Sequence, residues 1–258
     1  MADAAIRVER GGRLVRCTLD RPPLNLFEPG LIAALRATFV ELTADAGVGL
    51  VVLTGSGRAF TAGMNVNVLR DLDAAGAEAL ITSLHDAIDA VHRAPFPVIA
   101  AINGPALGAG FELALACDLR VAATGAILGL PEVRVGVPSV IQAALLAPLT
   151  GPGRAAELLL TGATIGAEQA LDWGLVNRVV EPARLEAAVQ ELAEPIIASG
   201  PHAIRLQKQL IIRWRESALT AAVRAGIPAF AAAYDTGEPR EGATAFLEKR
   251  APRFEGSR

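Results

Sequence analysis

Apolar residues along this chain follow two different spacings, which predict strands and helices in alternation. Val15, Cys17 and Leu19 alternate with polar neighbours, and this spacing is typical of a strand with one buried face. The stretches 49–55 and 97–102 are instead apolar almost without interruption. Such runs are typical of strands in a parallel sheet, where helices cover both faces. We therefore predict three strands in the first half of the chain, two of them buried on both faces.

Between the predicted strands, apolar residues recur every three or four positions, as they do along one face of a helix. This spacing predicts a helix that begins at Pro29 and ends before Gly47, and a second helix over residues 76–93. The apolar positions are Leu31, Leu35, Phe39 and Leu42 in the first helix and Leu80, Leu84, Ile88 and Val91 in the second. Strands that alternate with helices of this length predict an α/β fold with crossover connections.

The pattern changes in the second half of the chain, where strand signals become rare. One short strand is predicted at residues 178–180. We expect an α/β core over residues 1–200 and a helical region over residues 201–258, with no linker between them. Helical spacing covers residues 139–149, 153–160, 167–173, 183–199 and 201–225.

Composition narrows the class of protein. Of the 258 residues, 52% are apolar and 20% are charged, and the mean hydropathy is +0.39. A chain this apolar buries a large core, so global disorder is excluded. Aromatic residues make up only 4%, so the core is expected to be aliphatic. With 24 basic and 27 acidic residues, the net charge of −3 offers no basic surface for nucleic acid.

The sequence also lacks the features of a secreted or membrane protein. No uncharged apolar run approaches the roughly 20 residues of a membrane span. Residues 1–10 carry charges and no apolar signal-peptide core, so we expect a cytoplasmic protein with no membrane partner. Cys17 and Cys117 form no paired motif, and we expect two reduced, buried thiols.

Two glycine-rich turns follow the predicted buried strands. Residues 57–65 come after the strand that ends at Thr54, and residues 103–112 come after the strand that ends at Ile102. The second turn opens a predicted helix over residues 113–117. Backbone N–H groups in the first turn of a helix have no intrahelical partner, so such a turn is suited to stabilise an oxyanion. The same glycines would also serve tight strand-to-helix turns with no chemical role.

Two carboxylates lie next to these turns in the sequence. Glu112 falls in the first turn of the predicted helix, and Glu132 follows 20 residues later among valines. Each alone is compatible with an ordinary role, Glu112 as an acid at a helix start and Glu132 as a loop acid. Together, beside two turns suited to an oxyanion, they would form an acid/base pair.

Motifs of several other chemistries are missing from the sequence. There is no phosphate-binding G-x-x-x-x-G-K-[ST] motif and no G-x-S-x-G nucleophile motif. The three histidines, His85, His92 and His202, have no neighbouring cluster of cysteines or carboxylates in the sequence. We therefore predict no metal site.

Three segments of the chain together resemble one enzyme family. They are G-R-A-F-T-A-G-M-N at residues 57–65, I-N-G-P-A-L-G-A-G-F-E-L-A-L-A-C-D-L-R-V-A at residues 102–122, and L-P-E-V-R-V-G-V-P at residues 130–138. In this order and spacing they resemble the enoyl-CoA hydratase/isomerase (crotonase) superfamily. The resemblance extends from about Arg7 to Phe254, which is nearly the whole chain.

The resemblance implies an α/β fold of a particular kind, a crotonase-like spiral of ββα units with a helical C-terminal trimerisation region. Residues 1–200 would then hold the acyl-CoA site, and residues 201–258 would pack on the core and on neighbouring subunits. Members of this superfamily commonly form homotrimers or dimers of trimers and bind acyl-CoA thioesters. Coenzyme A enters as part of the substrate, and no separate cofactor is implied.

The resemblance also implies roles for individual residues. Met64 and Ala109 would donate their backbone N–H groups to the thioester oxygen, and Glu112 and Glu132 would act on water. This two-glutamate pattern favours hydration of a 2-enoyl-CoA. Further contacts with the substrate or with its CoA are implied at Ala62, Asn65, Val66, Asn67, Gly108, Phe246 and Lys249.

The sequence departs from the family pattern at several positions. Asn65 stands where the family usually has Asp, and Asn67 stands where Lys is frequent, which removes one expected phosphate contact. The glycine-rich turn that usually follows the second glutamate is replaced by residues 137–142. Its bulkier Val140 and Ile141 are expected either to line the acyl pocket or to pack in the core.

Three functions stay open at the level of sequence. The first is hydration of a 2-enoyl-CoA. The second is another enolate reaction on the same scaffold, such as double-bond isomerisation, decarboxylation or thioester hydrolysis. The third is a non-catalytic binding protein that keeps the fold. The presence of both Glu112 and Glu132 favours the first.

Overall fold

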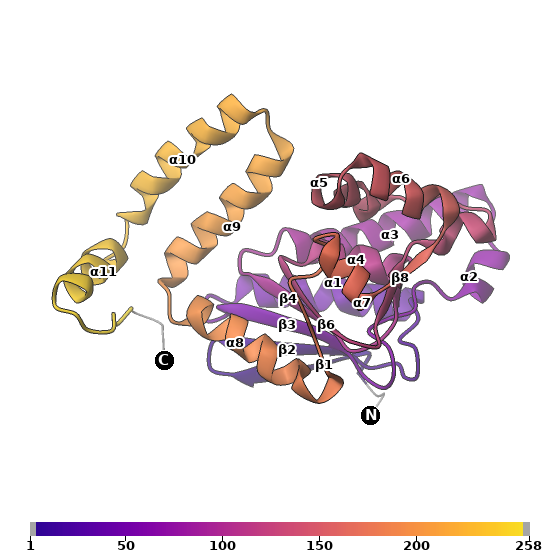
Figure 1. Cartoon of the computed structure of the whole chain (residues 1–258), viewed down its shortest axis with the longest axis horizontal. Helices are drawn as coiled ribbons and strands as arrows, with labels where there is room; N and C mark the ends of the chain where they lie inside the picture. The colour runs from indigo at the N-terminus through magenta and orange to yellow at the C-terminus, as the bar shows by residue number, and fades with distance from the viewer. Residues whose placement is uncertain (1–3, 255–258) are drawn as a thin grey trace.

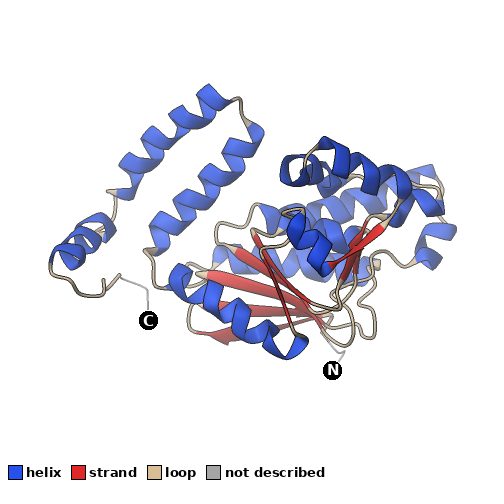
Figure 2. Cartoon of the chain, viewed as in Figure 1, coloured by secondary structure: helices blue, strands red, loops and turns tan. Residues whose placement is uncertain are grey.

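A six-stranded sheet forms the centre of the protein, for which the computed structural model describes residues 4–254 (Figure 1; Figure 2). The strand order is β1-β2-β3-β4-β6-β9. β1 pairs antiparallel with β2, and each later pair in this sheet is parallel. The strands are β1 (Ile6–Gly11), β2 (Leu14–Leu19), β3 (Leu50–Gly55), β4 (Val98–Ile102), β6 (Leu119–Ala123) and β9 (Arg178–Val180).

Helices cover both faces of this sheet. α1 (Pro29–Ala44), α3 (Ala74–His92) and α4 (Ala109–Ala116) form one layer. α8 (Leu185–Ile197) lies across the opposite face, in front of the strands in Figure 1. The predicted α/β fold with crossover helices is therefore confirmed.

Strand β3 shows why its apolar run is uninterrupted. Val51 and Leu53 belong to the core under the layer of α1, α3 and α4, whereas Leu50 and Val52 belong to the core under α8. Successive side chains of a strand point to opposite faces, so a strand covered on both sides needs apolar residues at every position.

A second sheet of three short strands lies beside the first. β5 (Ala106–Leu107) pairs parallel with β7 (Ile127–Gly129), and β7 pairs antiparallel with β8 (Thr164–Gly166). β5 belongs to the glycine-rich turn after β4. Its hydrogen bonds to β7 therefore connect that turn to β7 and, through β7, to β8. The remaining short helices are α2 (Val66–Arg70), η1 (Pro131–Val135), η2 (Ile141–Leu145), α5 (Leu146–Thr150), α6 (Pro152–Thr161), α7 (Ala167–Asp172) and η3 (Pro182–Arg184).

Three helices at the C-terminal end form an arm that projects from the sheet (Figure 1). They are α9 (Pro201–Glu216), α10 (Leu219–Ala233) and α11 (Glu238–Leu247). α10 lies on the side of α9 that faces away from the sheet (Figure 1). At the start of α11, the Glu238 carboxylate accepts the N–H groups of His202 at 2.9 Å and Ala203 at 3.0 Å, two donors that α9 itself leaves unpaired.

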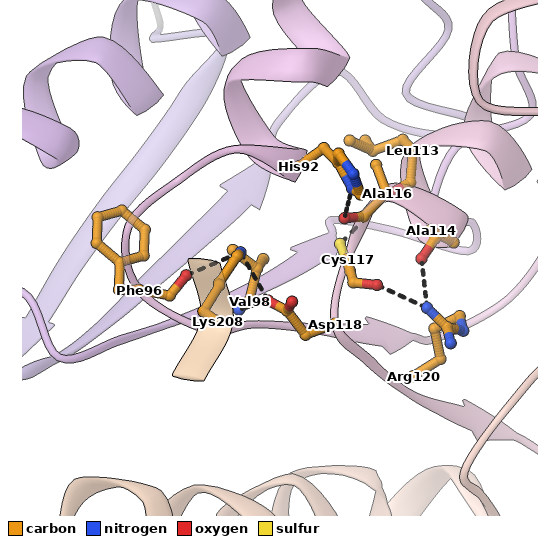
Figure 3. Close-up of polar contacts among 10 residues, drawn as sticks. All are labelled: His92, Phe96, Val98, Leu113, Ala114, Ala116, Cys117, Asp118, Arg120 and Lys208. Carbon is orange, nitrogen blue, oxygen red and sulfur yellow. Dashed lines mark hydrogen bonds and ion pairs between the residues drawn. The ribbon is translucent and has the colours of Figure 1, made fainter. Parts of the chain in front are cut away.

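A buried ion pair fastens the arm to the sheet. Lys208 Nζ on α9 lies 2.7 Å from Asp118 Oδ2 and donates to Phe96 O at 3.0 Å (Figure 3). The same carboxylate oxygen accepts the Val98 N–H at 2.7 Å. Lys208 is only 3% exposed, and breaking a buried pair of this kind typically costs about 3–5 kcal/mol. The pair therefore fixes where the arm leaves the core.

Some elements differ from the sequence prediction for identifiable reasons. β1 was not predicted, because all of its residues after Ile6 are exposed and show no apolar alternation. The helical stretch predicted over 201–225 is interrupted at Ser217 and Ala218, and the second helix continues to Ala233. The apolar spacing continues across the break, so spacing alone does not reveal it.

Two further helix predictions are corrected at their starts. The helix predicted over 113–117 begins at Ala109, because Gly108 with φ +55° makes the entering turn. The helix predicted over 139–149 begins with the tighter turns of η2 before α5.

Both cysteines are buried and free, as predicted. Burial raises the pKa of the Cys17 and Cys117 thiols to about 12, so both keep their protons. Within residues 4–254, no helix is both long and apolar enough to cross a membrane.

Candidate active site

A cavity of about 450 Å³ opens where the two glycine-rich turns end. The turn after β3 contributes Ala62, Gly63 and Met64, and the turn after β4 contributes Gly108 and Ala109. Loops that follow adjacent parallel strands emerge at the same edge of a sheet, where α/β folds commonly bind ligands. The structure therefore brings both turns to one cavity.

Backbone pairing holds the two turns against each other. Thr61 donates its N–H to Pro105 O at 3.2 Å and accepts the Leu107 N–H at 3.1 Å, which forms a bridge to Ala106. A Cβ added at Gly110 would lie 2.3 Å from Thr61 O. Only a residue without a side chain allows this approach, so Gly110 is required for the contact.

The backbone of Met64 is oriented by a second bridge. Phe27 donates its N–H to Gly63 O at 2.8 Å and accepts the Asn65 N–H at 3.0 Å. In this parallel bridge, the hydrogen bonds to Phe27 are made by Gly63 and Asn65, the two neighbours of Met64. The N–H of Met64 itself therefore points away from Phe27.

The two turns come close enough to act on one ligand atom. Gly63 has φ +87°, and a Cβ added to it would lie 2.6 Å from Leu107 O and 3.6 Å from Ala109 N. Ala109 is the first residue of α4, so its N–H has no intrahelical acceptor. The Met64 and Ala109 N–H groups thus lie on neighbouring backbone segments beside the cavity, an arrangement suited to an oxyanion.

Two buried side chains, Arg120 and His92, hold the opposite end of α4. Arg120 donates through Nη1 to Cys117 O at 2.7 Å and to Ala114 O at 3.3 Å (Figure 3). His92 Nδ1 lies 3.3 Å from Ala116 O. These contacts satisfy carbonyl groups that the end of the helix leaves without partners. They also fix α4 along its axis, and with it the N–H groups at its start.

Glu112 lies on the first turn of α4 and is 3% exposed. Its Oε1 accepts the Ala143 N–H at 3.1 Å. Burial raises the pKa of the Glu112 carboxyl to about 8, and the nearby charge of Glu132 adds to the rise. Hydrogen bonds from the Ala143 and Val140 N–H groups act in the opposite direction and are outweighed.

Glu132 lies in η1 and borders the same cavity. Its Oε2 accepts a hydrogen bond from Ser139 Oγ at 2.7 Å. A Cβ added at Gly108 would lie 2.6 Å from Glu132 Oε1, so that oxygen rests directly over the glycine turn. The two carboxyls therefore reach one cavity from different elements, and each is held by a different hydrogen bond.

The other predicted site residues divide into two groups. Ala62 and Val66 line the cavity. Asn65 instead begins α2, where its Oδ1 accepts the Asn67 N–H at 3.0 Å and its Nδ2 donates to Glu28 Oε1 at 2.6 Å. Neither asparagine is among the residues that line the cavity.

Phe246 and Lys249 do not reach this cavity within one chain. Phe246 is 83% exposed on α11, and Lys249 follows that helix. In Figure 1, α11 lies at the far end of the arm, on the opposite side of the molecule from α2. The structure of a single chain therefore does not bring these two predicted contacts to the site.

An apolar wall, of which the sequence indicated only the part in residues 137–142, extends the cavity beyond the glutamates. Val140 is part of this wall, whereas Ile141 packs against the core. The periodicity of residues 76–93 indicated a core-facing helix, because a face that lines a cavity has the same spacing as a face buried on a sheet. The wall is formed by Leu69, Leu72, Ala77, Leu80, Ile81, Leu84, Val135, Val137, Pro138 and Val140.

Across residues 4–254, no three His, Cys, Asp or Glu side chains come together as a metal site. The ionisable and hydroxyl side chains that line the cavity are Glu78, Glu112, Glu132, Arg134 and Ser139.

Comparison with known proteins gives one consistent family. A family model described as enoyl-CoA hydratase/isomerase matches residues 9–257. A putative enoyl-CoA hydratase of Thermus thermophilus is 37% identical over 96% of this chain and 100% of that protein. A crotonyl-CoA hydratase of Syntrophomonas wolfei is 36% identical over 98% of this chain and 99% of that protein. The crystal structure of an enoyl-CoA hydratase from Bacillus anthracis matches with a TM-score of 0.93 at 35% identity, covering 98% of this chain and 99% of that chain.

The raised pKa of Glu112 predicts how stability depends on pH. The folded carboxyl keeps its proton up to about pH 8, whereas an unfolded glutamate releases it near 4.5, so unfolding releases a proton between these values. The proton held by Glu112 therefore contributes to the free energy of unfolding. This contribution is complete below about pH 4.5 and is lost as the pH rises to about 8, by up to about 1.4 kcal/mol per pH unit. Glu112→Gln removes this dependence, so the variant gains stability relative to the wild type across this window.

Urea unfolding at several pH values measures the difference. Glu157→Gln, on the exposed face of α6, is the matched control and should keep the wild-type slope. Parallel stability curves for the wild type and Glu112→Gln would show that Glu112 titrates normally in the folded protein.

Proposed function

This chain belongs to the enoyl-CoA hydratase/isomerase family, and we propose that it adds water across the C2=C3 double bond of a 2-enoyl-CoA thioester. The observation that carries the proposal is the pair of carboxyls, Glu112 and Glu132, on one cavity beside two backbone N–H donors. Hydration needs both parts, because the added water must lose a proton, C2 must gain one, and the thioester oxygen must carry negative charge in between.

The N–H groups of Met64 and Ala109 are assigned to the thioester oxygen. Polarisation of the thioester carbonyl makes C3 electrophilic, and attack by water turns the carbonyl oxygen into an enolate oxyanion. Donors that are already in position stabilise this charge without reorganisation, and the loss of one such donor typically costs about 100- to 1,000-fold in kcat. Because both donors belong to the backbone, their side chains are free to serve the acyl pocket.

The two carboxyls are assigned as a pair that shares one proton. A pKa of about 8 at Glu112 supports one protonated and one ionised carboxyl near neutral pH. The ionised carboxyl takes a proton as the water oxygen bonds to C3, and the protonated carboxyl gives its proton to C2. The pair ends with the same number of protons, and the product is a 3-hydroxyacyl-CoA. Coenzyme A takes part only as a component of the substrate.

We assign an aliphatic acyl tail longer than the four carbons of crotonyl-CoA. The ten residues of the wall beyond the glutamates are all apolar, and Glu78 and Arg134 border the cavity beside them. Each methylene moved from water into such a wall contributes about 0.8 kcal/mol, or about fourfold in affinity. A four-carbon chain would leave most of this surface uncovered.

We further propose that three copies of the chain associate through the arm. Large apolar residues recur along the outer face of α10 at four-, four-, three- and four-residue intervals, which places them in one stripe. An exposed apolar stripe of this length marks a protein interface. Phe246 and Lys249 lie on the same arm, so any contact they make with CoA would involve the cavity of another copy. The stripe consists of Leu219, Val223, Ile227, Phe230 and Tyr234, which are 63–80% exposed.

Substitution of each glutamate tests hydration directly. Glu112→Gln and Glu132→Gln should each lower the rate of crotonyl-CoA and octenoyl-CoA hydration by about 100-fold or more, because each removes one proton-transfer group. Glu157→Gln should keep the wild-type rate. Near wild-type hydration by both cavity variants would refute the assignment. Incubation of the wild type with a 3-enoyl-CoA separates the alternative, because double-bond isomerisation would yield the 2-enoyl-CoA without water.

The acyl tail is tested by narrowing the apolar wall. Ile81→Trp, on the cavity side of α3, should lower kcat/KM for octenoyl-CoA by about 10-fold or more and leave crotonyl-CoA within about twofold. Thr82→Trp places the same bulk on the exposed side of the helix and should change neither value. Equal loss on both substrates from Ile81→Trp would place the tail elsewhere.

Association is tested by light scattering coupled to size exclusion. The wild type should have three times the 26.7-kDa mass of the chain, or six times if two trimers pair. Ile227→Asp should shift the mass toward the monomer, because it places a charge in the centre of the stripe. Arg224→Ala, exposed on the same helix outside the stripe, should keep the wild-type mass. A monomeric wild type at micromolar concentration would contradict the proposal.

A further inference from the structure

One short segment, residues 139–143, makes hydrogen bonds to both cavity carboxyls. Ser139 Oγ donates to Glu132 Oε2 at 2.7 Å, and Ala143 N–H donates to Glu112 Oε1 at 3.1 Å. Between them, the N–H of Val140 also donates to Glu112. The contacts with Glu112 come from backbone N–H groups, so they depend on the backbone conformation and not on the side chains of the segment. The contact with Glu132 instead requires a hydroxyl at position 139.

The segment keeps this path at a cost in backbone energy. Ile141 has φ +39°, a left-handed conformation that β-branched residues rarely adopt. Such strain persists only where the surrounding structure enforces it, and it concentrates at functional sites. Here it lies between the two residues whose N–H groups reach Glu112, Val140 and Ala143.

We propose that Ser139 is a positioning residue for the hydration reaction, which holds the Glu132 carboxyl so that Oε1 faces the reacting carbons. The inference rests on the proposed hydratase function. It assigns to Ser139 no direct contact with the substrate and no proton transfer of its own.

The geometry around Glu132 explains why one hydroxyl is enough. Oε2 is engaged by Ser139, and Oε1 rests over Gly108, where even a Cβ would come within 2.6 Å. Gly108 precedes Ala109, the proposed oxyanion donor, so Oε1 is the carboxyl oxygen nearer to the thioester. Without the Ser139 bond, the carboxyl could rotate about its side chain and exchange its two oxygens.

A neutral donor also suits the electrostatics of the site. The charged groups that border this cavity are Glu112 on α4, Glu78 on α3, and Glu132 and Arg134 on η1. Arg134 donates through Nε to Thr161 O at 3.2 Å, so its guanidinium is directed to α6. Ser139 is thus a side-chain donor to Glu132 that adds no charge beside the oxyanion.

The main test compares Ser139→Ala, Ser139→Thr and the control Ser83→Ala, which removes an exposed hydroxyl of α3. Ser139→Ala should lower kcat for octenoyl-CoA by about 10- to 100-fold, the effect of one hydrogen bond to a charged group, with KM within about twofold. Ser139→Thr, which keeps a hydroxyl, should recover most of the rate. A wild-type kcat in Ser139→Ala would overturn the inference.

A double substitution tests whether Ser139 acts through Glu132. If it does, adding Ser139→Ala to Glu132→Gln should lower the rate no further, because the group that Ser139 positions is already lost. A full additional loss in the double variant would mean that Ser139 acts independently, and would overturn the inference.

Crystal structures of the variants separate this inference from the proposed function. In Ser139→Ala the Glu132 carboxyl should leave the orientation that places Oε2 at residue 139 and Oε1 over Gly108, and in Ser83→Ala it should keep that orientation, whether or not the wild type hydrates an enoyl-CoA. An inactive wild type would refute the hydratase proposal, whereas an unchanged Glu132 orientation in Ser139→Ala would refute the role of Ser139.

Discussion

Helix α4 is buried on every side, and this burial constrains both of its ends. Every residue from Ala109 to Ala116 is buried, so the backbone groups that water would satisfy at the ends of a surface helix need partners inside the protein. At the C-terminal end, Arg120 and His92 supply them. At the N-terminal end the helix opens on the cavity, where unpaired N–H groups and the positive end of the helix dipole favour a bound negative charge. The candidate site is the end of α4 that the core leaves open.

The turn after β3 is held beside this end of α4 by hydrogen bonds from the side-chain amides of Asn25 and Asn103. Asn25 is fully buried and donates through Nδ2 to the carbonyls of Ser56, Ala59 and Phe60 at 2.9–3.2 Å. Asn103, from the turn after β4, donates to the same Ala59 carbonyl at 3.3 Å. A turn held from both sides cannot drift away from α4. Its backbone donors are therefore in position before any ligand arrives, which is the condition under which such donors stabilise a transition state most effectively.

The sequence allowed prediction of those parts of the site that depend on local pattern. Continuous apolar runs followed by glycines identified β3, β4 and both turns, because a strand buried on two faces and a close backbone approach each restrict the residue types. The Lys208–Asp118 pair joins residues 90 positions apart, and no local pattern indicates it. The role of Ser139 depends on the path that the chain takes after Glu132, including an unusual backbone conformation at Ile141. The part of the apolar wall on α3 escaped prediction because residues such as Ile81 have the spacing of core residues.

The distribution of large and small apolar residues on α10 explains the high apolar content of the chain. The face that packs on its own chain carries Ala222 and Ala225, whereas the outer face carries the large residues Ile227 and Phe230. A helix that served only a single chain would have the reverse arrangement, because large apolar side chains gain the most from burial. Small residues let α10 approach α9 closely, and the larger ones remain exposed on the single chain. The many aliphatic residues of the chain therefore pack on both faces of the sheet and line the cavity wall. Those on the outer face of α10, such as Ile227, stay exposed in a single chain.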